Sequence, residues 1–405
     1  MACLAAGRLV GDRAGDRPGR ACLLPAPSQY RAIGDRPRAE DHHANVTERA
    51  TPAEQPRFLI FGAGAVGSLI GARLAQSGCE VTLVGRPQNV DAVARDGVRM
   101  VVAGKVTNQA VRAARQNVAE AAGPFDHVLL TVKGYDTLDA LEQLEPVLQP
   151  GTILGSFQNG VGNEEAIVSA AVDQALLAGS LTLPVSMDEP GKVQQHSRRG
   201  GIAVAPVSPE VNVAPLVRKL GDAGFAARRY SDFRAMKWSK LLLNILGNAQ
   251  SAILDLPPAH VFADSELFRY ERLAFREAVA VMNRMRIPIV PLPGFSVPML
   301  RRVMSLPALL AQMILEPQVG GARGTKMPSL WWDLKRGKGR TEARYLNGAV
   351  VEAGTRYDLP TPVNSVLWAI LEQMTAVPTE WDRYRRDPVR LKALLRTATR
   401  LNAAG

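Results

Sequence analysis

The chain has 405 residues, which suits two or three domains, and its 46% hydrophobic content supports sizeable cores. Its net charge of +11 permits attraction to anions, but no zinc-ligand spacing or RNA-binding aromatic motif occurs, so we expect no metal and no nucleic-acid partner. The three cysteines form no C-x-x-C pair and no apolar run reaches the ~18 residues of a membrane span, which argues against a disulfide framework and a membrane protein and favours a cytoplasmic one.

The first 56 residues are rich in Ala, Arg, Gly, Pro and Asp, and the triplet Gly-Asp-Arg recurs in them. Neither a helical nor a strand period persists there. We predict that residues 1–56 are a disordered or wrongly started extension and that the fold begins at Arg57.

The next segment predicts a strand, a tight turn and a helix. Phe58–Phe61 is an apolar run, and it leads into a G-x-G-x-x-G triplet followed by an apolar helical pattern and a second strand at 80–84. Such a turn binds the pyrophosphate of a dinucleotide at the helix N-terminus. A glycine-rich turn without a ligand is the alternative. The predicted cofactor-binding residues are Gly62, Ala63, Gly64, Ala65, Val66 and Gly67.

The end of the second strand indicates which dinucleotide binds. A site for NAD usually has Asp or Glu there for the ribose 2′-hydroxyl, whereas this chain has Arg86. A guanidinium can hold a 2′-phosphate, so we predict NADP(H). The alternative is a solvated arginine on a loop.

From Arg57 to about Tyr230, strand patterns at 98–102, 126–133 and 152–157 alternate with helical ones, and Pro190-Gly191 marks a hairpin-like turn. This alternation predicts an α/β, doubly wound parallel sheet of Rossmann type over residues 57–230. Helical patterns dominate after Tyr230, so residues 231–405 are predicted to form an all-α substrate and catalytic domain, with an irregular or inserted segment at about 288–328.

Lys240, Asn244 and Asn248 are spaced four apart and would share one face of a helix whose other residues are mostly apolar. A polar stripe on a buried helix is costly unless it lines a wet or ligand-filled cleft, which we favour. A solvent-facing stripe on a surface helix is the alternative.

Two further segments carry candidate residues. Asn159 follows a core strand and would lie at the carboxyl edge of the sheet, where ligands bind, although Asn159-Gly160 is also typical of a plain turn. Glu342 lies in a helical pattern at 341–348. A single glutamate on a helix is usually solvated, so it is a candidate only together with the other segments.

Together these residues resemble the ketopantoate reductases (2-dehydropantoate 2-reductases) from about Arg57 to the last helices. The motifs that carry the resemblance are Gly62-x-Gly64-x-x-Gly67, Arg86, Thr131-Val132-Lys133, Gln158-Asn159-Gly160-Val161-Gly162, Lys237-Trp238-Ser239-Lys240-Leu241-Leu242-Leu243-Asn244, and Thr341-Glu342 followed by Tyr345-Leu346-Asn347-Gly348. The resemblance implies an NADPH-binding Rossmann domain, an all-α domain like that of 6-phosphogluconate dehydrogenases, and reduction of ketopantoate to pantoate for coenzyme A synthesis.

The resemblance also implies roles for single residues. Lys240 falls on the family's catalytic lysine, which donates a proton to the keto oxygen, and Glu342 falls on the glutamate beside the cofactor and substrate hydroxyls. Lys133, Asn159 and Val185 fall on positions near the cofactor. Positions that hold the substrate are matched by Asn159, Asn244, Asn248 and Ser329.

Some residues depart from the family pattern on the substrate side. Trp331-Trp332 follows Ser329 where many members have Met-Leu-Gln, and Ala249 replaces a frequent proline. The alternatives are therefore a paralogous NADPH-dependent reductase of another 2-oxo acid and a non-catalytic NADP(H)-sensing protein. We expect a small 2-oxo acid as the partner and leave a homodimer open.

Overall fold

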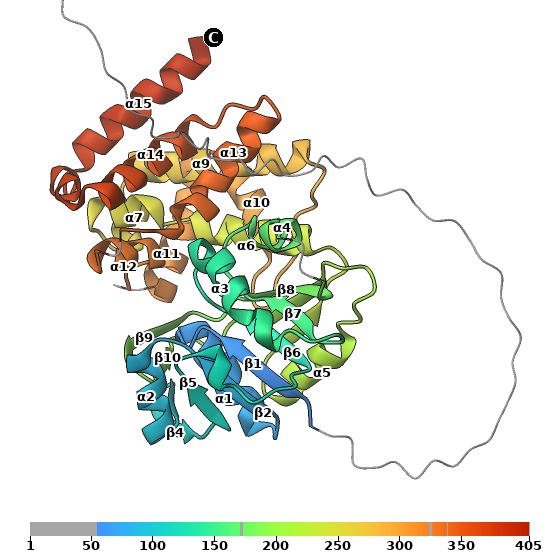
Figure 1. Cartoon of the computed structure of the whole chain (residues 1–405). Coiled ribbons are helices and arrows are strands. Elements are labelled where there is room, and N and C mark those ends of the chain that lie inside the picture. The colour runs from blue at the N-terminus through green and yellow to red at the C-terminus, as the bar shows by residue number, and fades with distance from the viewer. Residues whose placement is uncertain (1–54, 171–172, 324–325, 338, 405) are drawn as a thin grey trace, which may run out of the picture. The chain divides into compact units, whose positions relative to one another are not determined.

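A computed structural model describes residues 55–170, 173–323, 326–337 and 339–404 (Figure 1). The predicted extension, residues 1–56, lies outside the described residues except for its last two. The described chain contains two sheets, both formed before residue 230, and a helical half that begins at Phe233. The predicted fold class is confirmed.

The larger sheet has eight strands in the order β12-β11-β8-β7-β6-β1-β2-β5. Its central strands are apolar on both faces, as expected for a sheet covered by helices on each side. Its strands are β1 (Arg57–Phe61), β2 (Glu80–Val84), β5 (Ala113–Arg115), β6 (His127–Leu130), β7 (Ile153–Ser156), β8 (Leu176–Leu181), β11 (Ile202–Pro206) and β12 (Ala227–Arg229).

One pair in this sheet corrects the prediction of a parallel sheet. The neighbours β8 and β11 run antiparallel, whereas all the other pairs are parallel. A parallel neighbour requires a crossover to the other end of the sheet, usually through a helix. The chain between β8 and β11 instead forms two further strands and returns, so β11 enters in the opposite direction.

Those two strands belong to a second sheet of four, in the order β4-β3-β10-β9. The strand predicted at 98–102 belongs here, and Pro190-Gly191 does form the turn between β9 and β10. Helix α1 packs against both sheets and is buried on most of its surface, which explains its apolar sequence. The strands are β3 (Val98–Val102), β4 (Lys105–Gln109), β9 (Val185–Glu189) and β10 (Lys192–Gln195).

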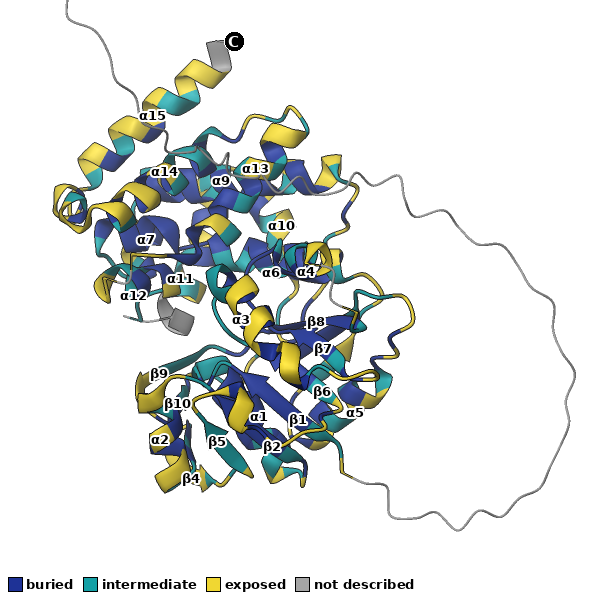
Figure 2. Cartoon of the chain, in the orientation of Figure 1, coloured by how far each residue is buried: buried dark blue, intermediate teal, exposed yellow. Residues whose placement is uncertain are grey.

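Helices cover the larger sheet and connect its strands. Buried residues follow the strands and the inward sides of these helices, whereas α3 shows exposed residues (Figure 2). The helices of this half are α1 (Ala65–Gln76), α2 (Pro87–Asp96), α3 (Thr137–Leu144), α4 (Asn163–Ser169) and α5 (Ala214–Asp222), with 3₁₀ turns η2 (Val118–Glu120), η3 (Gly134–Asp136) and η4 (Glu145–Val147).

The helical half is assembled around α9 (Ser265–Arg284), which contacts α6, α8, α10, α11, α13, α14 and α15. Asp264 caps α9 by accepting hydrogen bonds from two backbone N–H groups in its first turn. The other helices are α6 (Phe233–Ile245), α7 (Ala249–Leu254), α8 (Pro258–Ala263), α10 (Val297–Ser305), α11 (Ala308–Arg323), α12 (Ser329–Lys335), α13 (Asn347–Arg356), α14 (Pro362–Ala376) and α15 (Pro388–Ala404), with 3₁₀ turns η5 (Glu342–Tyr345) and η6 (Pro378–Arg383).

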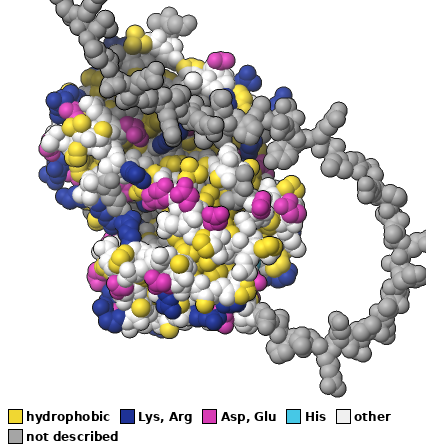
Figure 3. All heavy atoms as spheres, viewed as in Figure 1, with side chains coloured by type: hydrophobic (Ala, Val, Ile, Leu, Met, Phe, Trp, Pro, Cys, Tyr) yellow, Lys and Arg dark blue, Asp and Glu magenta, His cyan; other side chains and the backbone are white. Residues whose placement is uncertain are grey.

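The segment at 288–328, predicted to be irregular, contains helices α10 and α11. Pro298 lies in the first turn of α10 and Pro307 directly precedes α11, positions where a missing N–H costs no helical hydrogen bond. None of the described helices is both long and apolar enough to cross a membrane. On the face drawn in Figure 3, Lys and Arg side chains are interspersed with Asp and Glu.

The glycine turn before α1 allows a matched test of packing. A Cβ at Gly67 would lie 2.2 Å from the Gly62 oxygen, whereas a Cβ at Gly64 would meet nothing within 4 Å. We expect Gly67→Ala to lower the free energy of unfolding by about 1–3 kcal/mol, since a packed helix must shift. Gly64→Ala, whose φ of −89° suits alanine, should change it by less than about 0.5 kcal/mol. Urea unfolding followed by circular dichroism measures both, and equal stabilities would contradict the packing shown.

Candidate functional site

The glycine turn between β1 and α1 is open toward a ligand. Gly62 has φ +118°, and the N–H groups of Gly62 and Ala63 donate to the Val84 oxygen at 2.8 and 3.1 Å. The Ala63 oxygen accepts from Asn89 Nδ2 at 2.8 Å. No described side chain caps α1, and a Cβ at Gly64 would meet nothing within 4 Å, so there is open space beside the start of the helix. This arrangement fits the pyrophosphate of a dinucleotide.

Arg86 lies next to this turn. It is the residue before α2, it is exposed, and the preceding Gly85 is so close to Ala63 that a Cβ there would lie 2.7 Å from the Ala63 Cβ. The predicted anion-binding turn and the predicted 2′-phosphate ligand are thus neighbours, although 22 residues separate Gly64 from Arg86.

A buried charge cluster lies at the end of β6. Lys133 makes an ion pair with Glu342, and its Nζ is 3.6 Å from Asp333 Oδ2. Both carboxylates are buried, and Asp333 Oδ2 accepts no hydrogen bond from the described part of the chain. Burial disfavours the charge on Lys133, but the two carboxylates outweigh that effect and raise its pKa. Burial, together with Asp333, raises the pKa of Tyr135 to about 12.

The loop that follows β7 brings Asn159 to the same region. Asn159 is exposed, and its carbonyl accepts from Asn163 Nδ2 at 3.0 Å. Gly160 has φ +82° and packs so closely that a Cβ would lie 2.5 Å from the Tyr345 oxygen, which also accepts from the Val161 N–H. This loop therefore packs directly against η5, the segment that begins with Glu342.

Helix α6 is fastened to this loop by a lysine that the sequence analysis did not single out. Lys237 Nζ donates to the Gln158 oxygen at 2.9 Å and lies 2.7 Å from Glu164 Oε1. Lys237 and Glu164 are almost fully buried, with side-chain exposures of 3% and 1%. Lys240, one turn further along α6, is half-buried. The predicted catalytic lysine thus extends from a helix that is tied to the Asn159 loop.

The prediction that Lys240, Asn244 and Asn248 share one helix face is wrong for Asn248. Helix α6 ends at Ile245, and Gly247 turns the chain with φ +59°, so Asn248 precedes α7 instead. The buried carboxylate of Glu271 accepts from the Gly247 N–H at 2.7 Å and holds this turn. The prediction failed because it extended the four-residue helical spacing past Gly247, the residue at which the helix is broken.

Asn248 still reaches a predicted substrate residue. Its Nδ2 donates to the Asn244 oxygen at 3.1 Å and to Ser329 Oγ at 3.4 Å, and its Oδ1 accepts from the Leu330 N–H at 3.3 Å. The amide of this buried residue therefore joins the end of α6 to the start of α12. Asn244 is half-buried and Ser329 is exposed, so both offer accessible polar atoms.

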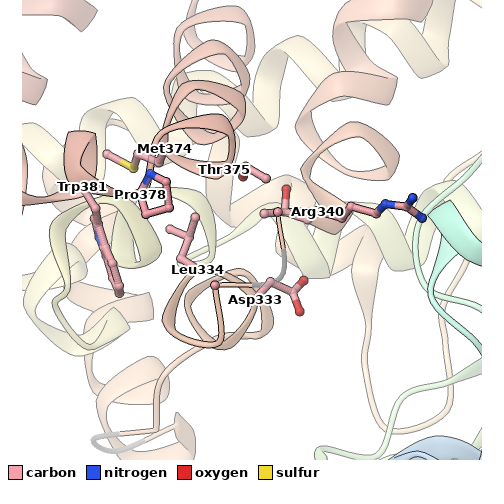
Figure 4. Close-up of a pocket in the computed structure, with 10 residues that line it drawn as sticks. Asp333, Leu334, Arg340, Met374, Thr375, Pro378 and Trp381 are labelled. Atoms are coloured by element: carbon pink, nitrogen blue, oxygen red, sulfur yellow. The ribbon is translucent and has the colours of Figure 1, made fainter. Parts of the chain in front are cut away.

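Val185 and Trp331, which the sequence analysis also named, pack against the apolar cores of the two halves. Val185 begins β9, where its half-buried side chain packs against the apolar core of the sheet half. Trp331 is held in the helical half, since its ring nitrogen donates to Asp255 at 2.6 Å and its ring packs edge-on against Trp381. A small hollow lies beside Asp333, lined also by Met374 and Trp381 (Figure 4).

The residues that the sequence analysis missed differ in how visible they were. Lys237 stands in the quoted motif three positions before Lys240, a spacing that places the two side chains near each other on a helix, but it was given no role. Glu164 is in the first turn of a helix, where a glutamate is ordinary and solvated, so nothing marked it. Asp333 carried no local signal, because its partner Lys133 is 200 residues away.

A Rossmann-type sheet with a dinucleotide-fitting turn and a following helical half is the architecture of two-domain nicotinamide-dependent reductases. The family profile described as ketopantoate reductase PanE/ApbA matches residues 58–209, and the one described as ketopantoate reductase PanE/ApbA C terminal matches residues 232–375. The chain belongs to this family, and it is an oxidoreductase of the class that acts on CH–OH groups.

Curated relatives include the 2-dehydropantoate 2-reductases of Pyrococcus horikoshii, 28% identical over 78% of this chain and 96% of theirs, and of Archaeoglobus fulgidus, 29% identical over 77% and 95%. Among solved structures, a PanE/ApbA family ketopantoate reductase from Ralstonia eutropha is 29% identical, with a TM-score of 0.67 over 80% of this chain and 99% of that one. D-mandelate dehydrogenase with NADH and anilino(oxo)acetate, 22% identical, shares the fold, with a TM-score of 0.68 over 81% and 99%.

The two asparagines near α12 give contrasting expectations. Asn248→Ala removes a buried amide with three hydrogen bonds and leaves the Leu330 N–H without its acceptor, so we expect a loss of about 1–3 kcal/mol in unfolding free energy. Asn244→Ala, at a half-buried side chain, should cost about 0.5 kcal/mol or less. Thermal and urea unfolding compare the two variants. Equal losses would argue against a linking role for the Asn248 amide.

Proposed function

We propose that this protein reduces a 2-oxo acid with NADPH and that 2-dehydropantoate, which yields pantoate, is its substrate. The observation that carries the proposal is the convergence of three segments. Helix α6 with Lys240 is bound through Lys237 to the loop of Asn159, and that loop packs on η5, which begins with Glu342. The names of the relatives support the choice of substrate.

The residues that would hold NADPH follow from the fit of the glycine turn. The N–H groups of Ala65, Val66 and Gly67, in the first turn of α1, would bind the pyrophosphate, because those of residues 62–64 are bonded within the turn. Arg86 would bind the 2′-phosphate, which a carboxylate at that position would repel. Lys133, Asn159 and Val185 contact the rest of the cofactor. When bound, its reduced nicotinamide supplies the hydride.

The chain's own residues supply the proton and the orientation. Lys240 Nζ hydrogen-bonds to the keto oxygen and donates its proton to it as negative charge develops, so the ammonium stabilises the transition state more than the ground state. Glu342, which makes an ion pair with Lys133, accepts hydrogen bonds from hydroxyl groups of the cofactor and the substrate. Asn159, Asn244 and Ser329 bind the substrate, and Asn248 orients Ser329.

The two alternatives, reduction of another 2-oxo acid and non-catalytic NADP(H) sensing, are tested by the same experiments. Trp331, one of the residues behind the first alternative, is held in the helical half by Asp255 and Trp381. A sensor would bind NADPH without turnover on any 2-oxo acid.

Replacing the proposed proton donor tests catalysis. We expect Lys240→Met to lower kcat about 10²- to 10⁴-fold with 2-dehydropantoate, because no group then donates the proton. The Kd for NADPH, measured by fluorescence, should stay near the native value. Absorbance of NADPH at saturating substrate measures turnover, beside a panel of other 2-oxo acids. Lys105→Met, at an exposed lysine on β4, is the control. Native turnover in Lys240→Met would refute the assignment, and equal turnover across the panel would refute the substrate.

Replacing Arg86 tests the cofactor. We expect Arg86→Gln to raise the Kd for NADPH about 10- to 100-fold, the value of one or two charge-assisted hydrogen bonds, and to leave the Kd for NADH unchanged. Arg95→Gln, at the other end of α2, is the matched control. A variant that weakens both cofactors equally, or neither, would contradict a role in reading the 2′-phosphate.

A further inference from the structure

The Lys237–Glu164 ion pair has no access to a ligand. Its side chains are 3% and 1% exposed, and each charged group is already satisfied within the protein. Glu164 Oε1 accepts from Ser156 Oγ at 2.6 Å as well as from Lys237, and Lys237 also donates to the Gln158 oxygen. The pair therefore acts through the elements that it joins.

Those elements carry two of the residues assigned to the reaction. Lys237 lies on α6, one turn before Lys240, so the two side chains are neighbours on the helix surface. The Gln158 carbonyl that accepts from Lys237 belongs to the residue directly before Asn159. One ammonium thus fixes the helix of the proposed proton donor against the loop of the proposed nicotinamide and substrate contact.

The energetics of a buried ion pair fit a role in positioning these elements better than a role in stabilising the fold. Removing two charges from water carries a large free-energy cost for each, and apolar side chains of similar volume are often as stable in the same place. What an apolar pair lacks is the fixed direction of the two hydrogen bonds. Because misplacing a catalytic group by about 1 Å costs about 100-fold in rate, that direction matters for the reaction.

We propose that Lys237 and Glu164 are positioning residues whose buried ion pair sets the separation between Lys240 and the Asn159 loop. The inference rests on the proposed function for the roles of Lys240 and Asn159. The ion pair takes no part in the chemistry itself. It holds α6 against the carboxyl edge of the sheet.

The test replaces both charges at once in the full chain. Lys237→Met with Glu164→Met matches the length of the glutamate side chain, is one atom shorter than the lysine side chain, and leaves no unpaired buried charge. The control is Lys192→Met with Glu189→Met, which removes an ion pair of the same residue types at an exposed hairpin. Glu164→Asp is the second variant, because it keeps both charges and shortens one side chain by a methylene group.

For the double variant we expect a thermal midpoint near the native value and kcat about 100-fold lower, with KM and the NADPH Kd within about threefold. Glu164→Asp should lower kcat about tenfold by a smaller displacement of the same kind, and it carries the test where the double variant does not fold. The exposed control should turn over at the native rate. Native kcat in either folded variant would overturn the inference, because a purely structural pair would recover activity together with stability.

A structural readout separates this inference from the proposed function. Crystal structures of the native chain and of a folded variant should differ by about 1 Å in the distance between the Cα atoms of Lys240 and Asn159. An unchanged distance would overturn the positioning role even in an active enzyme. If the native chain does not oxidise NADPH in the presence of any 2-oxo acid, the proposed function is refuted. The Lys240–Asn159 distance would still decide whether the ion pair positions the helix.

Discussion

The buried ion pair between Lys237 and Glu164 is the constraint on which the geometry of the site depends. It joins an α/β half, whose strands are held by backbone hydrogen bonds, to a helical half held by apolar packing around α9. Apolar contacts are non-directional and would allow α6 to slide or rotate by small amounts. A charge pair with two further hydrogen bonds, from Ser156 and to the Gln158 oxygen, has one favourable arrangement.

A second charge cluster, Lys133 with Glu342 and Asp333, also joins the α/β half to the helical half. Burial lowers the pKa of Lys133, but the two buried carboxylates that face this half-buried ammonium raise it overall. Segments that lie 209 residues apart, β6 and η5, are thereby brought to one place. Position 160 requires glycine for steric reasons, because η5 leaves no room for a side chain there.

Much of the fold was predictable because its signals are local. The strand–turn–helix at 58–76, the strands near 98–102 and 152–157, and the turn at 190–191 all follow from short patterns of apolar residues, Gly and Pro. The misses have one cause in common. The antiparallel entry of β11, the separate four-stranded sheet and the break of α6 at Gly247 each depend on what the chain meets after it has folded back.

The sequence by itself determined the family, the Rossmann-type half, the helical half and the dinucleotide-fitting turn, since adjacent residues carry all of these. It also pointed to Lys133, Lys240 and Glu342 by resemblance. Only the tertiary structure decided their partners: that Lys133 pairs with Glu342, that Asp333 joins them, and that Lys237 ties α6 to the sheet. The physical reason is that a buried charge is stabilised by groups distant in the chain, and no local pattern specifies which distant group will lie within hydrogen-bonding distance.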